Sequence, residues 1–404
     1  MADLDVTEKQ ASLGHCAIGL EPSSGSPVVP DVFVPLYSED VAVNINVDDD
    51  NPIVGIREAR YKVFRGQEDY QGTIRILAEP KTAPHLFNML LLKGTSTGTP
   101  TTGFTHPFTL GKPDSYTLEI NKGDIPFRFF GVEAKAITPA FEENKMVLEV
   151  SLSALGQFSV ARITSAASTT IVLDDSERAN PADGLVAGDT LRLYDVSAGT
   201  YEDVVLSDIA SDGKTLTVAS ISGTYVEGDY LWLKPLSPSY SLDEPFNWGR
   251  TEFRFASGSA AALSATQVRV EKGSSWNLMH NLEDEAGAKR SGKYRPEALV
   301  RTTGDLEVNL KKFFKDGQEQ GRFLHRLSRA LVIRHFSPSD AGSDGTDSEL
   351  RITVSEFYAR ENTVPLATGE IVYNNIVLAP VYNSSDSQMF KIEIVNSLAG
   401  ANYE

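Results

Sequence analysis

Alternation of apolar and polar residues recurs along this chain and restricts it to a β-rich fold. Residues 41–47 read Val-Ala-Val-Asn-Ile-Asn-Val, and residues 304–310 read Gly-Asp-Leu-Glu-Val-Asn-Leu. Successive side chains of a strand point to opposite faces, so this pattern predicts strands with one buried and one wet face. Further segments of this kind are residues 72–77, 115–120, 127–132, 146–152, 266–270, 350–354, 371–378 and 390–395. The sequence therefore predicts a mainly β protein.

Two segments have helical spacing instead. Residues 83–92 carry Pro84 in the first turn and four apolar residues on one face, and Gly94 follows their end. Proline early and glycine late are typical helix boundaries, so a helix is predicted there. A second helix is predicted over residues 318–331, with Phe323, Leu324, Leu327 and Leu331 on one face.

The two halves of the chain repeat one order of elements. Each runs strand, long polar connection, strand opening on glycine, helix, two strands and a closing strand. Gly72 precedes Leu118 by the same number of residues as Gly304 precedes Leu350. A β-rich chain can always be aligned loosely with itself, but the shared helix and its position favour duplication of a domain.

Residues 162–236 differ from the two halves in residue pattern and contain a shorter repeat of their own. The sequence LVAGDTLRL at 185–193 returns as YVEGDYLWL at 225–233, and a short apolar strand precedes each. A Gly-Asp turn that feeds a strand is typical of a hairpin. We therefore expect an inserted small β-barrel or β-sandwich here. The other predicted parts are an N-terminal extended arm (1–35), a first domain (36–161), a linker (237–262) and a second domain (263–404).

Composition disfavours nucleic-acid recognition and membrane insertion. The 37 Lys and Arg against 55 Asp and Glu give a formal charge of −18. Such a chain repels phosphate backbones, although DNA can still pass an acidic surface without binding to it. The N-terminus lacks the features of a secretory signal, and no apolar run approaches the ~20 residues of a membrane span. A soluble protein without membrane contact is expected.

Residue patterns for catalysis are missing. The single Cys16 excludes an intramolecular disulfide and a Cys-based zinc site, and no two histidines have metal-ligand spacing. No nucleophile elbow occurs, and the glycine-rich residues 94–103 lack the lysine of a phosphate loop. The Asp48–Asp50 run lacks the alternating ligands of a calcium loop and is interpreted as a turn. We expect no enzyme, cofactor or metal, while carboxylate pairs that meet only in space stay open.

Basic residues gather in the two long polar connections, residues 51–69 and 279–303. Connections of this length exceed the usual range, and their equivalent places favour contact with an acidic surface of another copy. Two ordinary solvated loops are the alternative. The candidate inter-ring or inter-subunit contacts are Arg57, Arg60, Lys62, Arg65, Lys289, Arg290, Lys293 and Arg295, with Arg301 at the end of the second cluster.

Most of the chain resembles the tail tube proteins of long-tailed bacteriophages. The resemblance rests on residues 70–76 with the helix 83–92, on 104–110 ahead of 116–120, and on 129–134 ahead of 146–152. The second half looks like a repeat of that domain at 294–296, 304–310 and 320–327. These motifs cover about 36–160 and 263–398; the arm and the insert lie outside them.

The resemblance implies two tandem tail-tube β-sandwich or barrel domains, each with one flanking helix, around the insert. It implies a non-catalytic virion protein of the phage tail, assembled in the host cytoplasm. Three chains would make a homotrimeric, pseudo-hexameric ring, and stacked rings would form the conduit for DNA ejection without binding DNA specifically. The long loops 51–69 and 279–303 would pack on the neighbouring ring. A tape measure protein and a tail terminator are the expected further partners.

Two other classes of function are considered. A head decoration or tail terminator subunit would share the acidic β-rich composition but would not need two equivalent halves. A secreted carbohydrate-binding or hydrolytic β-sandwich is disfavoured by the missing signal and by the scattered tryptophans, Trp232, Trp248 and Trp276.

Overall fold

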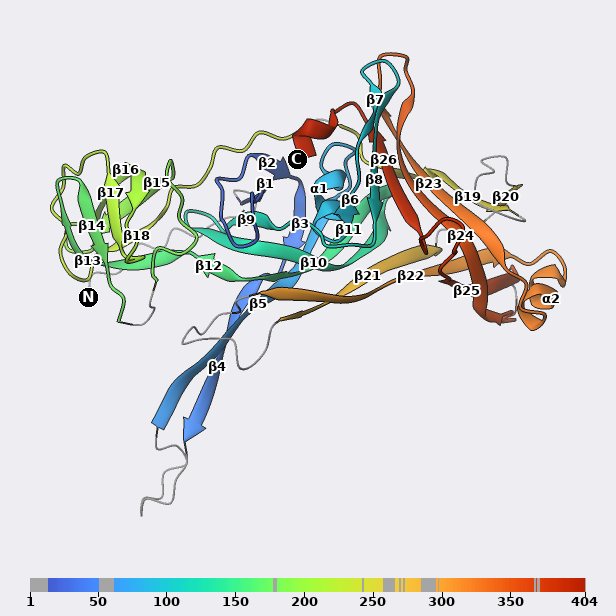
Figure 1. Ribbon diagram of the computed structural model, residues 1–404, viewed down its shortest axis with the longest axis horizontal. Coiled ribbons are helices and arrows are strands. Elements are labelled where there is room, and N and C mark those ends of the chain that lie inside the picture. Colours follow the sequence, from blue (N-terminus) through green and yellow to red (C-terminus); the bar gives the residue numbers. More distant parts are fainter. Residues whose placement is uncertain are drawn as a thin grey trace.

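The computed structural model describes residues 14–50, 62–176, 180–241, 243–256, 266–268, 270–271, 273–284, 296, 298–366, 368 and 371–403. Across these residues the chain is mainly β, as predicted, with two short α-helices (Figure 1). No described helix has the length and apolarity needed to cross a bilayer.

The elements fall into a first unit, an insert and a second unit. The first unit comprises β1 (His15–Leu20), β2 (Val32–Val34), β3 (Leu36–Glu39), β4 (Ala42–Asp50), β5 (Lys62–Leu77), α1 (Ala83–Asn88), β6 (Leu92–Lys93), β7 (Thr97–Thr99), β8 (Gly103–Thr109), β9 (Tyr116–Asn121), β10 (Pro126–Glu142), β11 (Lys145–Ala154) and β12 (Gly156–Phe158). The insert comprises β13 (Val160–Ala167), β14 (Thr170–Leu173), β15 (Thr190–Asp195), β16 (Thr200–Ile209), β17 (Thr215–Val218) and β18 (Tyr230–Leu233). The second unit comprises β19 (Asn247–Ala256), β20 (Thr266–Val268), β21 (Ser275–Asp284), β22 (Leu299–Phe313), α2 (Gln318–Leu324), β23 (Arg329–Asp340), β24 (Asp347–Thr363), β25 (Tyr373–Pro380) and β26 (Lys391–Asn396), before a 3-10 turn (Gly400–Tyr403).

One antiparallel sheet, here called the main sheet, runs through both units. Its strand order is β4-β5-β11-β10-β21-β22-β25-β24. Each unit therefore contributes a first hairpin and a closing hairpin in the same spatial order. Beyond β24 the ladder continues through β23 and β19, and β19 meets β11 to close a barrel.

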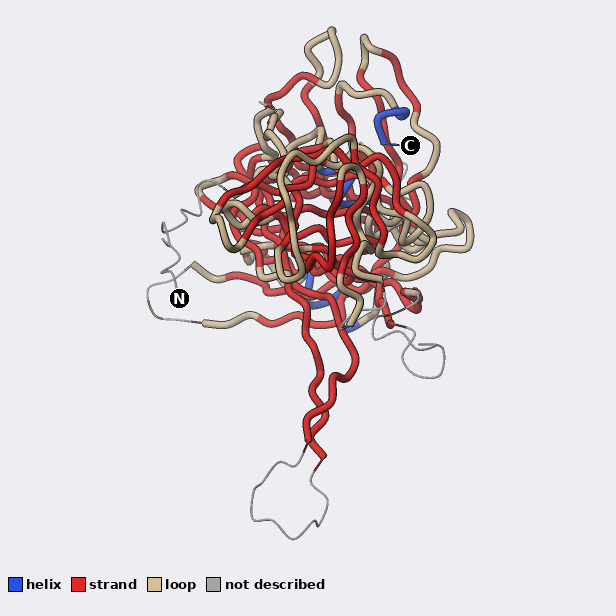
Figure 2. Tube along the Cα trace, turned by 90° about the vertical axis from the view of Figure 1, so that its left-hand side faces the viewer, coloured by secondary structure: helices blue, strands red, loops and turns tan. Residues whose placement is uncertain are grey.

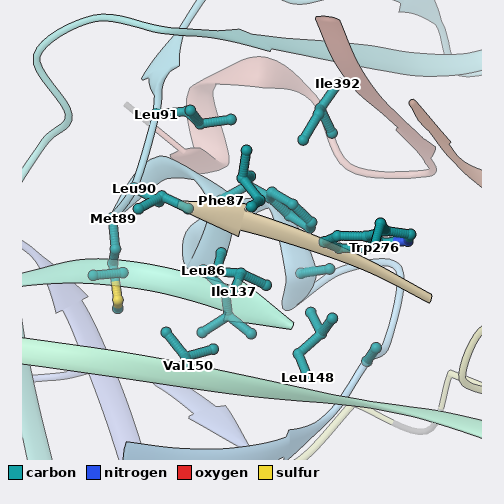
Figure 3. Close-up of a cluster of buried hydrophobic side chains, with 14 of the residues drawn as sticks. Leu86, Phe87, Met89, Leu90, Leu91, Ile137, Leu148, Val150, Trp276 and Ile392 are labelled. Carbon is teal, nitrogen blue, oxygen red and sulfur yellow. The ribbon is translucent and has the colours of Figure 1, made fainter. Parts of the chain in front are cut away.

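A single hydrophobic core fills this barrel and joins the units. Figure 3 shows Phe87 of α1 beside Trp276 of β21, with Ile137, Val150 and Ile392 around them. The Phe87 and Trp276 ring centroids lie 6.2 Å apart. Burying such a side chain contributes about 1.5–3 kcal/mol, so the packing of α1 holds the two units together.

The insert is a separate closed barrel with the strand order β13-β14-β17-β16-β15-β18 and its own core. The repeated Gly-Asp sequences form turns, as predicted. Asp189 and Asp229 each accept a hydrogen bond from the backbone amide three residues earlier, at 2.7 and 2.8 Å. Gly188 and Gly228 take φ values of 99° and 102°, which other residues resist. The two Gly-Asp turns therefore lead into β15 and β18 in the same way.

Both helices are shorter than predicted. α1 ends at Asn88, and α2 ends at Leu324 because residues from Arg329 onward belong to β23. Leu331 pairs with Val354 in the ladder and is buried there. Pairing with a distant strand outweighs the local helical spacing.

The expected unpacked arm and linker are also partly wrong. Residues 15–20 form β1, which pairs with β9, and Cys16 and Ile18 are fully buried. The linker region contains β19, whose Phe253 is buried against the core and whose ladder partner is β23. In both places, the strand pairs with another strand that is distant in the sequence.

The described parts of the two long polar connections belong mainly to strands. β5 already begins at Lys62, β21 extends to Asp284, and β22 begins at Leu299. The hairpin β4/β5 projects away from the rest of the molecule in two perpendicular views (Figures 1 and 2). Its strands are therefore available to a neighbouring molecule.

Candidate assembly surface

The two units meet at an internal joint between β10 and β21. Ala136 pairs with Met279 and Ile137 pairs with Leu278 across the joint. Beside these pairs, the Thr138 hydroxyl donates to Asn277 Oδ1 at 2.8 Å. In the main sheet, β10 of the first unit is thus followed directly by β21 of the second unit.

A buried arginine, Arg301, joins the two units through hydrogen bonds. Arg301 of β22 donates from Nε to Glu133 Oε2 at 3.0 Å, and its other nitrogens donate to the carbonyls of Ala134, His280 and Met89. The Arg301 and Glu133 side chains are 9% and 4% exposed. Burial raises the pKa of Glu133 although Arg301 opposes the shift. A buried pair of this kind fixes geometry more than it adds net stability, because desolvation offsets the attraction.

Helix α1 is enclosed at the joint. All six of its residues are buried, and His280 Nδ1 lies 2.9 Å from the carbonyl oxygen of Leu90, just past the helix. The second unit therefore covers the helix of the first unit as well as the edge of β10.

The two ends of the main sheet have no such cover. Among the described residues, β4 pairs only with β5, and residues 358–363 of β24 pair only with β25. Unpaired strand edges present free backbone N–H and C=O groups that favour pairing with another chain. The sheet therefore begins and ends on an open edge.

Helix α2 is as exposed as α1 is buried. None of its residues is buried; its last residue, Leu324, is 67% exposed, and Leu327, which follows the helix, is 56% exposed. Asn362 Nδ2 donates to Gln320 Oε1 at 3.0 Å, which ties the helix to the open end of β24. Further exposed apolar residues at the end of β22 and in the β24–β25 connection are Phe314, Leu366 and Ile371. Exposed apolar side chains concentrated near an open edge indicate a contact surface.

The face of the main sheet opposite the core is polar and carries mostly short side chains. One row crosses five strands of both units as Thr73, Ser151, Ala136, Met279 and Asp305. The adjacent row is Arg75, Glu149, Thr138, Asn277 and Glu307. None of the residues in these two rows is buried. This face can line an aqueous space without burying apolar surface.

A second buried charge cluster fastens the insert to the first unit. Arg128 of β10 donates to Glu119 Oε2 at 2.9 Å and to Asp189 Oδ2 of the insert at 2.7 Å. All three side chains are at most 1% exposed. Burial raises the pKa of Glu119, while Arg128 acts against this shift. The insert is held by a specific polar contact as well as by the chain.

Of the eight predicted basic contacts, Lys62 and Arg65 are among the described residues. Lys62 and Arg65 belong to β5, where Lys62 pairs with Asp50 and Arg65 with Val47. Arg57, Arg60, Lys289, Arg290, Lys293 and Arg295 lie outside the described residues. Arg301 sits inside the joint, and its partner Glu133 had no signal in the local sequence.

Comparison with protein-family models finds no match for this sequence, and comparison with curated proteins finds none either. Within the described residues, no cluster of His, Cys, Asp or Glu side chains is arranged to hold a metal ion.

Proposed function

We propose that this chain is a non-catalytic structural subunit that polymerises into stacked rings and forms the tail tube of a long-tailed phage. Each ring contains three chains and therefore six sheet-forming units. The tube conducts DNA during ejection, and the protein acts without cofactors in the virion tail.

The asymmetry between the joint and the two sheet ends supports this proposal. Inside the chain, β21 covers the edge of β10 and the second unit covers α1. The equivalent edge on β24, the helix α2 and the strand β4 are left uncovered among the described residues. A second copy placed on β24 would repeat the internal joint. A heterologous contact of this kind generates a ring where the rotation closes.

The polar face of the main sheet supports the conduit role. In a closed ring this face would surround a channel lined mostly by polar side chains, among which the acidic Glu149, Asp305 and Glu307 outnumber the basic Arg75. The formal charge of −18 keeps passing DNA from adhering, because phosphate binding needs clustered basic groups. Stacking of rings is assigned to the two long hairpins, β4/β5 and β21/β22.

Negative-stain electron microscopy of the purified protein tests the proposal. Rings and tubes of uniform bore are expected, with trimer-sized species in light scattering before elongation. A head decoration or tail terminator protein would give single rings or trimers that never stack. A monomer at every concentration and salt condition would refute the assembly role.

A further inference from the structure

The first hairpins of the two units share an irregularity at the same place. In β21/β22 the register shifts just before Leu282, which then pairs with Arg301. In β4/β5 it shifts just before Val47, which then pairs with Arg65. Both shifts skip one residue on the first strand and two on the second. Such bulges are specific features of a strand pair, so their agreement makes Arg65 the positional counterpart of Arg301.

The closing hairpins share a second irregularity. In β10/β11 the ladder skips Lys135, and in β24/β25 it skips Arg360. Both skipped residues are basic and both follow an alanine, Ala134 or Ala359. The open edge of β24 therefore repeats the edge of β10 that the internal joint uses.

These two correspondences fix the register of a contact between chains. Glu361 takes the place of Ala136, and Asn44 takes the place of Met279. Since Ala136 pairs with Met279 inside the chain, Glu361 of one copy should pair with Asn44 of the next.

The groups that hold Arg301 also have counterparts at the open end. The carbonyl of Ala134 corresponds to that of Ala359, and the C-cap residue of α1, Met89, corresponds to His325 at the end of α2. A helix C-terminus carries partial negative charge and favours a cation. At the position of Glu133 stands Tyr358, whose hydroxyl donates to Glu356 Oε1 at 3.0 Å. The carboxylate of Glu356 is therefore close to the position that an arginine of a second copy would occupy if it docked as Arg301 does within the chain.

We infer that a second copy of this chain docks β4 on β24 in the register of the internal joint, with Arg65 locking that contact as Arg301 locks the joint within the chain. This inference rests on the proposed function and assigns its ring contact to particular residues. The same contact would cover the exposed apolar side chains of α2.

Matched arginine variants separate the two roles. Arg301→Ala removes a buried lock and should lower the thermal midpoint of the monomer. Arg65→Ala should raise the concentration needed for assembly by more than about tenfold, as loss of a buried interfacial charge contact does. Lys145→Ala removes an exposed charge at the start of β11 and should change neither property. Assembly of Arg65→Ala at the wild-type concentration would overturn the role of Arg65.

A cysteine pair tests the register independently. Oxidation of a chain carrying Asn44→Cys and Glu361→Cys should give covalent dimers and trimers on non-reducing gels, whereas Asn44→Cys with Thr363→Cys should not. Cys16 is fully buried and does not compete. Wild-type tubes without crosslinking at 44 and 361 would overturn this inference and leave the tube function standing. Failure of the wild type to associate at all would overturn both.

Discussion

Replacing Arg128 by methionine should destabilise the contact between the insert and the first unit more than any surface charge change. Among the described residues, Arg128 is the only cationic partner of Glu119 and of Asp189. Methionine fills most of the volume but leaves two carboxylates at most 1% exposed without their cation. Removing one partner of a buried ion pair costs about 3–5 kcal/mol.

The loss should depend on pH in a defined direction. Burial raises the pKa of Glu119, and removing Arg128 takes away the charge that opposes this shift. Below the ordinary carboxyl range both states are protonated, so the cost of the variant is small. As pH rises through the unfolded pKa, the unfolded chain releases a proton that the folded protein retains, and folded stability falls. The deficit should therefore be larger at pH 8 than at pH 5.

Urea unfolding, with hydrogen exchange in β10 and β15 as the readout, measures the loss of stability on each side of the contact. Arg192→Met is the matched control, because its ion pair with Asp203 is more exposed, at 16% and 26%, and is worth at most about 1 kcal/mol. Adding Glu119→Gln and Asp189→Asn to Arg128→Met should recover part of the loss. Equal stability of Arg128→Met and Arg192→Met would refute the reasoning.

Four further predictions concern other parts of the molecule. Leu324→Asp and Leu327→Asp should leave monomer stability unchanged, since both side chains are exposed, but block assembly in sedimentation; normal tubes would contradict the contact role of α2. Deleting 160–233 should leave a folded, polymerising body, because Val160 pairs with Trp232 and the ends to be joined are adjacent; circular dichroism and microscopy check this, and an unfolded product would contradict it. Burial raises the pKa of Glu79 to about 7, so wild-type stability should fall between pH 5 and pH 7; Glu79→Gln should remove that fall in thermal scans, and an unchanged pH profile would contradict it. Burial also raises the pKa of Cys16, so thiol reagents should label it only after unfolding, and rapid labelling of the native protein would show that β1 opens.

Several strands could be predicted from the sequence because one of their faces is buried and the other is polar. The alternation in residues 304–310 leads directly to Leu306, Val308 and Leu310, which all face the core. The Gly-Asp repeat of the insert was equally readable, since turn chemistry depends on neighbouring residues only.

Features that depend on distant pairing could not be predicted. Leu331 fits a helix locally but belongs to β23, because Val354 provides a ladder partner. Gly72 and Gly304 looked equivalent in the sequence, yet the shared bulges align Gly72 with Val308. Arg301 stood out as part of a basic cluster, but its contact with Glu133 arises only when β10 and β21 meet.

Joining two units in one polypeptide changes how an array grows. In the proposed ring every second junction would be covalently tethered, so it would form at an effective concentration set by the chain and would not dissociate upon dilution. The two kinds of junction are then free to diverge in sequence, as Glu133 and Tyr358 have at corresponding places. The insert likewise appears once for every two units, which spaces such modules at alternate positions around any closed array. Covalent fusion would thereby halve the number of junctions between separate chains in a closed turn.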